Sequence, residues 1–481
     1  MTTDTASPDT GTAELRNALS RFDKPAIRSH VRSIKRPDLS HIPGDRGLPI
    51  IGHALQITYQ LHTWINAQYE CHGPAFRARA VDREIVFFLG PEANRIILQN
   101  EGKDFSNFLA YGPSIKGLLD DNVLALDFHH HKHTRKTLQA AFRREAVEGH
   151  IELMNPMISG GIDHWVTDRT VKSTPQIRKL LLDTGAKVFL GLDMGRDADM
   201  MNQAFVDLVK AGNAIVRLRS IPFLPYARAL RARVTMEDFV RSNIAGRRSV
   251  PEEGRDIFSQ LCNAKDEHGN HLSDKEVCNQ IIFLLFAAHD TTSSAMSSTF
   301  YHLASDQAWQ EELREEMFSL GKEHLEFDDF DKLEKTHWTV QEILRMYPPA
   351  PMLPRYSLKE FEFEGLRIPL GTPLMGFSPF THYMSEYWTD PYTFDPLRFS
   401  PERAEDKKEF WQYVPFGGGA HKCLGLHFAQ VQGKMFLFHF LKKYRIYKDP
   451  KMDHLRFRFF PLTFPTDGLP LKFVRTDSSG A

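Results

Sequence analysis

The sequence predicts a mainly α-helical fold with a small β portion (α+β), built as a single large domain. Hydrophobic residues follow a helical period from residue 91 to about residue 331, with few strand-like stretches. No low-complexity linker and no internal repeat divides the chain, which favours one α-rich unit. Short runs rich in Phe, Leu and Ile, bounded by turn residues, predict the β portion at residues 76–80, 84–89, 356–373 and 455–473.

The composition is that of an ordinary globular protein. Among 481 residues, Lys and Arg number 60 against 61 Asp and Glu, and 42% of the residues are hydrophobic. A net charge of −1 supplies no basic field for a phosphate backbone, so no nucleic-acid partner is expected. The four cysteines form no CxxC pair, which argues against a disulfide framework or a zinc module and for a reducing compartment.

The beginning of the chain is polar. Residues 1–42 are expected to form a flexible arm, with residues 43–481 forming the folded domain. A basic run at Arg28, Arg32, Lys35 and Arg36 suits a solvated arm or a partner-facing segment, of which the arm is favoured. The N-terminus lacks the apolar core of a signal peptide, and the longest apolar stretch, residues 281–288, is too short to span a bilayer. We therefore expect no transmembrane anchor and a cytoplasmic location.

A long helix is predicted to begin at Ser273. Ser273 and Glu276 form an S-x-x-E capping box ahead of the apolar run IIFLLFAA. The polar residues Asp290, Thr291 and Thr292 then interrupt the apolar pattern. Two interpretations stand at this point: the hydroxyls bond back to carbonyls four residues earlier and serve a site, or the helix emerges into solvent after Ala288.

A glycine-rich loop at residues 416–425 contains a single cysteine, Cys423, directly ahead of a helical pattern over residues 426–444. A helix N-terminus favours a thiolate over a thiol, and a thiolate ligates metal. The glycines let the backbone pass close to a large flat group. A phosphate-binding loop is disfavoured, because the Lys-[Ser/Thr] ending that it needs is missing.

This loop resembles the signature F-x-x-G-x-[R/H]-x-C-x-G of the cytochrome P450 family, matched at every position from Phe416 to Gly425. The resemblance implies a cytochrome P450 fold and a haem b cofactor. It identifies Cys423 as the axial thiolate of the haem iron, with Phe416 beside the cofactor.

Further segments follow the family's order. The segment AAHDTT at residues 287–292 matches the oxygen-binding helix, except that Ala288 replaces a glycine. By resemblance, Asp290 and Thr291 are catalytic and handle protons opposite the cysteine, while His289 is a packing residue. Glu342 and Arg345 supply the E-x-x-R pair, which with Arg398 is assigned a structural role.

The resemblance also implies partners for the two haem propionates. These are His131 and Arg135 in an H-x-x-x-R segment, Arg355 after a Pro-Pro turn, and His421 in the cysteine loop. A competing hypothesis is a transition-metal site made by His129, His130, His131 and His133, but no carboxylate or thiolate accompanies that cluster in the sequence.

The predicted function is a haem-thiolate monooxygenase that inserts one atom of O2 into a C–H bond of a lipophilic substrate of steroid, terpenoid or fatty-acyl type. The substrate pocket is expected to include Phe283 and Ala287, with residues 108–124, 220–226 and 350–353 around them. The alternatives are a peroxide-driven hydroxylase and a non-catalytic haem-thiolate sensor or carrier. Neither needs the Asp290–Thr291 pair.

The expected electron donors are a ferredoxin and a ferredoxin reductase, since no redox module is appended to the chain. An acidic iron–sulfur protein is predicted to dock on cations beside the cysteine loop, and the protein itself is expected to be a monomer. The candidate cations are Lys132, Lys136, Arg143, Arg144, Lys422 and Lys434.

Overall fold

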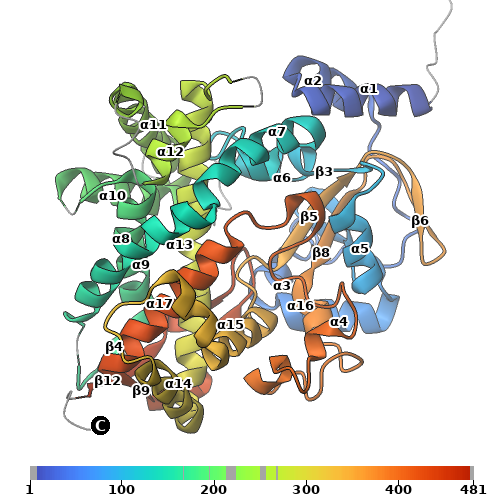
Figure 1. Ribbon diagram of the computed structural model, residues 1–481. Helices are drawn as coiled ribbons and strands as arrows, with labels where there is room; N and C mark the ends of the chain where they lie inside the picture. The colour runs from blue at the N-terminus through green and yellow to red at the C-terminus, as the bar shows by residue number, and fades with distance from the viewer. Residues whose placement is uncertain are drawn as a thin grey trace, which may run out of the picture. The chain divides into compact units, whose positions relative to one another are not determined.

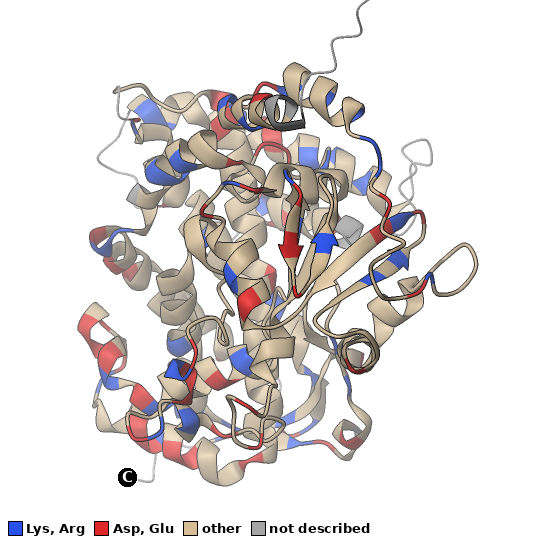
Figure 2. Cartoon of the chain, turned by 90° about the vertical axis from the view of Figure 1, so that its right-hand side faces the viewer, with Lys and Arg blue, Asp and Glu red and all other residues tan. Residues whose placement is uncertain are grey.

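A computed structural model describes residues 8–165, 167–193, 195–212, 224–249, 256–266 and 269–476. The chain forms two compact units, each assembled from separate stretches. The first unit contains residues up to 137, 352–381 and 409–423, and the second contains residues 138–351, 382–408 and those from 424 onward. Charged residues of both signs are spread over both units (Figure 2).

The first unit is organised around a five-stranded sheet with the order β1-β2-β8-β5-β3. All neighbouring strands are antiparallel except β2 and β8, which are parallel. A separate hairpin joins β6 and β7. The predictions of strands at residues 76–80, 84–89 and 356–373 are confirmed. The strands are β1 (Ala75–Ala80), β2 (Arg83–Phe88), β3 (Phe105–Ser106), β5 (Met352–Ser357), β6 (Phe361–Phe363), β7 (Leu366–Ile368) and β8 (Pro373–Phe377).

Helices flank this sheet, and aromatic rings fill the contact between them. Trp64 packs edge-on against Phe76 and Phe87, whose rings stack 5.1 Å apart. Aromatic pairs at such separations add to the energy of simple burial. The helices are α1 (Pro8–Arg21), α2 (Lys24–Ser33), α3 (Ala54–Tyr59), α4 (Leu61–His72), α5 (Pro91–Gln99), α6 (Asn107–Ile115) and, with its last residue across the unit boundary, α7 (Phe128–Leu138). The short α16 (Ser378–His382) also ends across that boundary.

The structure differs from the prediction of a flexible arm in residues 8–33, because this segment forms α1 and α2. Leu15, Leu19 and Ile27 are at most 2% exposed and pack together with Leu358. The spacing of Leu15 and Leu19 places both on one helix face, a stripe too narrow to stand out in a polar segment. Ion pairs from Arg16 to Asp104 and from Lys24 to Asp121 also bind these helices to the unit.

The second unit is mainly helical, and α13 (Asp274–Ser305) is its longest helix among the described residues. It packs against α9, α11, α15 and α17 (Figure 1). The predicted start is confirmed: Ser273 is the N-cap, and it forms the capping box with Glu276. The other helices are α8 (Arg144–Ile162), α9 (Ser173–Leu190), α10 (Arg196–Gly212), α11 (Pro225–Ser249), α12 (Ile257–Asn263), α14 (Gln307–Ser319), α15 (Glu334–Met346) and α17 (Leu426–Lys443).

Two small sheets complete the second unit. One has the order β4-β12-β9, from β4 (Thr170–Lys172), β12 (Pro470–Arg475) and β9 (Tyr444–Lys448). The other pairs β10 (Phe457–Arg458) with β11 (Phe464–Pro465). The hairpin predicted in residues 455–473 is therefore β10–β11, while the end of that stretch joins a different sheet.

Hydroxyl residues continue deep into α13. Residues 292–300 are all buried, so the interpretation that this helix emerges into solvent after Ala288 is wrong. The side chains of Thr291, Ser297, Ser298 and Thr299 instead donate to carbonyls four residues earlier, as the other interpretation expected.

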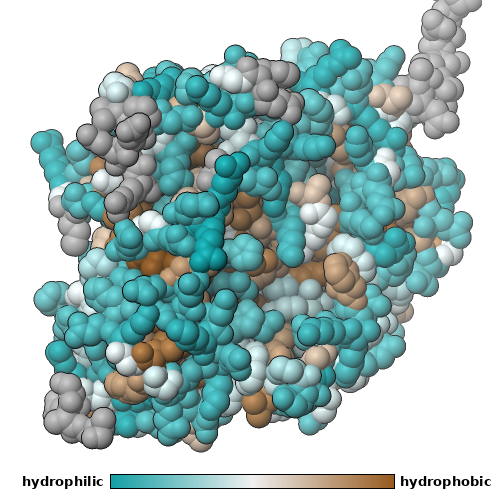
Figure 3. Space-filling model, in the orientation of Figure 1, coloured by the Kyte–Doolittle hydropathy of each residue, from teal (hydrophilic) through white to brown (hydrophobic). Residues whose placement is uncertain are grey.

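The face of the molecule seen in Figure 3 is mostly hydrophilic, with hydrophobic side chains grouped in its hollows. Within the described ranges, none of the helices combines the length and the apolar character that crossing a bilayer requires.

Candidate functional site

The cysteine loop lies in the first unit and is closed by its own backbone. Cys423 N donates to Phe416 O at 2.9 Å, and Lys422 N donates to Gly419 O at 3.2 Å. Gly417 has a φ of +67°, a left-handed conformation that glycine adopts without strain. The Cys423 side chain is exposed, and the first residue of α17 is Leu426, so the cysteine lies just ahead of a helix as predicted.

The glycines of this loop serve contacts within the protein. A Cβ atom on Gly419 would lie 2.1 Å from Leu98 O in α5, and one on Gly418 would lie 2.6 Å from the Trp411 ring. Either substitution would push the loop away from its support. These contacts are a reason for glycine at positions 418 and 419 in addition to the approach to a flat group that the sequence predicts.

Four predicted propionate partners also lie in the first unit. The rings of His131 and His421 stack with centroids 3.7 Å apart, which joins α7 to the cysteine loop. Arg135 lies one turn beyond His131, within electrostatic range of Cys423. Arg355, in β5, is 5% exposed and donates from Nε to Ile97 O at 2.9 Å and from Nη1 to Pro354 O at 2.8 Å.

Burial determines the protonation of the two histidines, His131 and His421. Burial, with a smaller effect from Arg135, lowers the pKa of His131 to about 4. Burial also lowers the pKa of His421 well below its usual value, and His131, Arg355 and Arg135 add to that shift. Both imidazoles are therefore neutral at pH 7 and act through N–H donation, while the two guanidinium groups supply the positive charge. This donor set fits a ligand with two carboxylates, as the haem of the resemblance would require.

The predicted catalytic pair lies on α13 in the second unit. Thr291 Oγ1 donates to Ala287 O at 2.7 Å. Asp290 is 3% exposed, and its Oδ1 lies 3.2 Å from His289 Nδ1 and 3.7 Å from Arg178 Nε. Two neighbouring groups thus face the buried carboxylate.

His289 is a packing residue, as predicted. Its Nε2 contacts Arg178 O at 2.9 Å, and its ring meets Phe205 edge-on.

Arg178 of α9 was not identified from the sequence. Its side chain is 41% exposed and lies over the Phe464 ring of β11 at 4.1 Å. It therefore connects the buried Asp290 to the surface of the unit. No local pattern marks it, because its partners are more than a hundred residues away in the chain.

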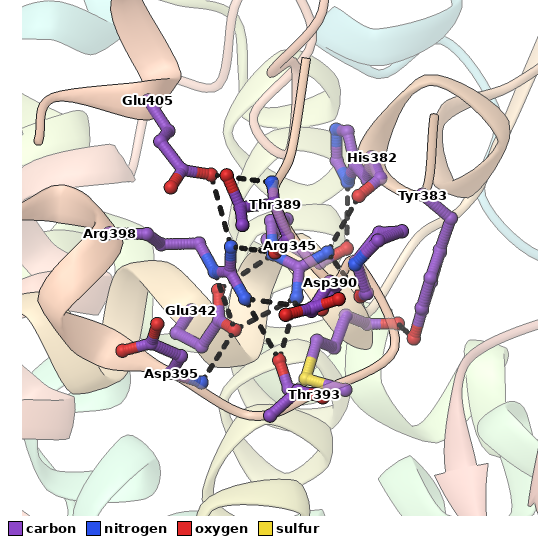
Figure 4. Close-up of polar contacts among 12 residues, drawn as sticks. Glu342, Arg345, His382, Tyr383, Thr389, Asp390, Thr393, Asp395, Arg398 and Glu405 are labelled. Carbon is purple, nitrogen blue, oxygen red and sulfur yellow. Dashed lines mark hydrogen bonds and ion pairs between the residues drawn. The ribbon is translucent and has the colours of Figure 1, made fainter. Parts of the chain in front are cut away.

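Glu342, Arg345 and Arg398 come together in the second unit and are each 0% exposed (Figure 4). Arg345 Nε and Nη2 bind the Glu342 carboxylate at 2.7 and 2.8 Å, and Arg398 Nε binds Glu342 Oε1 at 3.1 Å. Other N–H groups of the same two guanidinium groups donate to backbone carbonyls. Arg345 donates to His382 O and Pro391 O, and Arg398 donates to Thr389 O and Thr393 O. Two cations thus share one carboxylate and hold the segment 382–398 against α15.

Glu405 is a fourth member of this network that the sequence analysis missed. It is 4% exposed and accepts from Arg398 Nη1 at 3.1 Å, Arg403 Nη2 at 2.6 Å and Thr389 N at 2.9 Å. Burial alone would raise the pKa of Glu405, but these hydrogen bonds outweigh it and lower that pKa. Glu405 supplies the second negative charge that the two buried arginines need.

The proposed pocket residues are distributed over both units. Phe283 is buried and Ala287 is partly buried on α13 in the second unit, while residues 108–124 belong to the first. Residues 220–223 of the expected pocket lie outside the described residues.

The prediction that Lys434 is a surface cation for docking is wrong. Lys434 is 7% exposed, because α17 turns it inward, and its Nζ donates to Phe330 O at 2.6 Å. Burial lowers the pKa of Lys434 to about 8. Lys132, Lys136, Arg143, Arg144 and Lys422 are exposed as expected. Arg144, however, is paired with Glu148 and Asp328, which offset its charge.

The histidines of α7 do not converge on one point. His131 stacks on His421, whereas His130 stacks on Phe22 of the N-terminal segment. In the part of the chain that the structure describes, no group of three or more His, Cys, Asp or Glu side chains is placed to hold a metal ion.

Comparisons with known proteins agree on one family. The model of the family described as cytochrome P450 matches residues 42–473. A Mycobacterium tuberculosis protein that carries the name cytochrome P450 136 is 33% identical over 438 residues, covering 90% of this chain and 88% of the relative. The taxane 13-alpha-hydroxylase of Taxus cuspidata is 27% identical over 460 residues, covering 92% and 93%.

A solved structure shares the fold. The structure described as retinoic acid bound cyanobacterial CYP120A1 superimposes with a TM-score of 0.82 at 26% identity, covering 92% of this chain and 100% of that one. The match confirms the predicted cytochrome P450 fold, mainly α with a small β portion. Because the family model spans nearly the whole chain, the protein belongs to the cytochrome P450 family and is a haem-dependent monooxygenase.

Proposed function

We propose that this protein is a haem b monooxygenase in which Cys423 is the axial ligand and a terpenoid-like lipophilic molecule is the substrate. The observation that carries the proposal is the closed loop that presents Cys423, in the same unit as the stacked His131 and His421 and the guanidinium groups of Arg135 and Arg355. When bound, a haem with a thiolate ligand supplies the chemistry that activates oxygen, because the thiolate pushes electron density toward O–O cleavage.

The residues of the first unit hold the cofactor. Arg135 and Arg355 offset the charge of its two carboxylates, and the neutral imidazoles of His131 and His421 donate hydrogen bonds to them. The backbone bond between Cys423 N and Phe416 O closes the loop and holds the backbone of Cys423 in place. Phe283 and Ala287, both on α13, are the apolar side chains proposed to contact the lipophilic substrate.

Asp290 and Thr291 handle protons. Asp290 is buried but lies beside Arg178, whose side chain reaches solvent, so a proton from solvent has a short path to the carboxylate. The Thr291 hydroxyl, on the next residue, would take the proton onward from the carboxylate. A peroxide-driven enzyme or a haem-binding sensor has no use for this pair, which is why a monooxygenase supplied with electrons is favoured.

The first prediction concerns coupling. Thr291→Ala is expected to bind substrate normally but to release hydrogen peroxide in place of product, because the proton no longer arrives where it is needed. Product formed per reductant consumed should fall by about 10- to 100-fold. The measurement is product, peroxide and reductant consumption in the same reaction.

Thr299→Ala is the matched control, because Thr299 Oγ1 makes the same kind of bond, to Ala295 O at 2.9 Å, two turns further along α13. Equal coupling in Thr291→Ala and Thr299→Ala would remove Thr291 from the mechanism and favour the peroxide-driven alternative.

The relatives support a terpenoid-like substrate. One is named a taxane hydroxylase and one is described as bound to retinoic acid, and both compounds are isoprenoid-derived. Spectral titration of the haem-loaded protein with all-trans-retinoic acid, a taxane diterpene, a steroid and a long-chain fatty acid tests the proposal. Displacement of the iron's water ligand by the fatty acid alone would place the protein in the fatty-acyl class.

We further propose that an acidic ferredoxin, itself reduced by a ferredoxin reductase, is the electron donor. Lys132 and Lys422 are both exposed and directly follow His131 and His421, whose rings are in contact. Two cations therefore flank the point where α7 meets the cysteine loop. A positive pair next to the ligand loop suits the encounter with an acidic partner.

The second prediction follows from this placement. Charge reversal in the double variant K132E/K422E should slow the first electron transfer from an acidic ferredoxin by about 10-fold at low salt, and the difference should shrink as salt rises. Stopped-flow reduction under carbon monoxide measures the rate. The control is Lys103→Glu, an exposed cation of the same unit, and a rate indifferent to both salt and the double reversal would place the docking surface elsewhere.

A further inference from the structure

One buried carboxylate of the first unit has no part in the function proposed above. Asp127 is 1% exposed and directly precedes α7. It accepts hydrogen bonds from Ser106 Oγ at 2.5 Å, Asn107 N at 2.7 Å and Phe108 N at 3.4 Å. An ionised carboxylate only accepts hydrogen bonds, so three converging donors match its charged form.

These donors are the beginning of α6, twenty residues earlier in the chain. Ser106 is the N-cap of α6 and accepts from Leu109 N at 3.0 Å while donating to Asp127. Asn107 also donates from its side chain to Leu124 O at 3.1 Å. The unpaired amides and the dipole of a helix start both favour a negative charge there, so Asp127 anchors α6 from outside the helix.

Arg355 connects the same helix to the predicted propionate group. Its side chain is hydrogen-bonded to that of Tyr111, one turn beyond Asn107 in α6. Burial lowers the pKa of Arg355, and the charges of Tyr111 and Asp127 oppose that shift. Asp127 and Arg355 therefore hold α6 at two successive turns and attract each other.

The ionisation of Asp127 responds to pH. Burial raises the pKa of Asp127 to about 6, against the opposing effects of its three hydrogen-bond donors and of Arg355. The charged and titratable groups that face it are Arg355 from β5 and, through Arg355, Tyr111 from α6. Above pH 6 the carboxylate is charged and accepts all three donors. As the pH falls through about 6, the added proton removes the charge whose burial raised the pKa. The closed start of α6 binds this proton more tightly than its solvated open form does, so it becomes more stable relative to that form.

We propose that Asp127 is a positioning residue that fixes the beginning of α6 and holds Arg355 beside it, so that the propionate side of the site and the α6 wall of the substrate pocket move together. The proposal rests on the proposed function for the roles of Arg355 and α6. Asp127 is buried and contacts the start of α6, and it acts through that helix and through Arg355.

The third prediction uses hydrogen exchange of the haem-loaded protein at pH 7.5. Asp127→Asn keeps the size of the side chain but replaces an acceptor by an amide, so the amides of residues 107–111 should exchange about 10-fold faster or more. Asp104→Asn is the matched control. It removes a carboxylate whose ion-pair partners, Arg16 and Lys359, both lie outside α6, so exchange in α6 should stay unchanged.

A pH series separates a positioning role from a general structural one. In the natural sequence, protection of residues 107–111 should rise as the pH is lowered from 7.5 to 5, after correction for the intrinsic exchange rate, because protonation relieves the burial of the charge. In Asp127→Asn the same amides should show one constant, lower protection. Tyr111→Phe should loosen residues 111–115 and leave the first amides protected, because their contact with Asp127 remains.

Unchanged exchange in Asp127→Asn, or protection in the natural sequence that does not rise as the pH is lowered from 7.5 to 5, would overturn the proposal. If Asp127→Asn is isolated without haem, the pH series on the natural sequence is by itself the test of the proposal. The proposed function is tested separately by the reduced carbon monoxide spectrum of the natural sequence. A protein without the thiolate-type band would fail that test, and its exchange data would still decide the role of Asp127.

Discussion

Replacing Cys423 by histidine is expected to abolish both the thiolate-type absorption of the reduced carbon monoxide complex and the monooxygenase activity. Histidine is a neutral ligand and lacks the electron donation of a thiolate, even where it binds the same metal. The variant should retain its helix content, since the loop is closed by the backbone bond from residue 423 to Phe416 O and not by the side chain. Absorption spectra of the reduced, carbon monoxide-treated protein provide the measurement.

The other cysteines are the controls for this experiment. Burial raises the pKa of both Cys262 and Cys278 to about 11, so these side chains stay protonated at neutral pH and are poor metal ligands. Cys71 lies on α4, away from any glycine-rich loop. Alanine at each of the three positions should leave the spectrum unchanged, and a thiolate-type band that survived in Cys423→His would disprove the assignment of Cys423.

Glu342→Ala is expected to cause the largest loss of stability in the second unit. The substitution leaves Arg345 and Arg398, both 0% exposed, without the carboxylate that they share. Removing one partner of a buried ion pair costs about 3–5 kcal/mol, because the remaining charge stays desolvated. Urea unfolding followed by circular dichroism measures the free-energy difference.

Glu334→Ala on the same helix is the control. Glu334 is exposed, in the first turn of α15, and its removal should cost less than about 1 kcal/mol. A Glu342→Ala variant as stable as Glu334→Ala would mean that the network of Figure 4 contributes little to the fold. In Glu342→Ala, Glu405 would remain bound to Arg398, so part of the charge of that arginine would still be compensated.

Local patterns in the sequence predicted the parts of the site that are themselves local. The start of α13 followed from the capping box of Ser273 and Glu276, and the cysteine loop from ten consecutive residues. Contacts between distant segments leave no such pattern in the sequence. The fold is needed to show that Glu405 binds Arg398 and that Arg178 lies beside Asp290.

The two incorrect predictions, for Lys434 and for residues 8–33, also depend on contacts between distant segments. Lys434 was counted as a surface cation because a lysine is rarely buried, and only the packing of α17 shows that its amine binds Phe330 O. The sequence predicts an arm over residues 1–42 and misses the helices within it, because the apolar stripe of residues 8–33 is narrow and its partner Leu358 is distant in the chain. Helical periodicity tells which face is apolar and not what covers it.

The bond from Thr291 to Ala287 limits what the threonine hydroxyl can donate. A hydroxyl has one proton to give, and here that proton is committed to a carbonyl of the same helix. In this conformation Thr291 can therefore accept a hydrogen bond but cannot donate one. Under the proposed role, its side chain must rotate about χ1 before the hydroxyl can pass on a proton. Proton delivery would then depend on a rotamer change within α13, and not only on the arrival of a proton at Asp290.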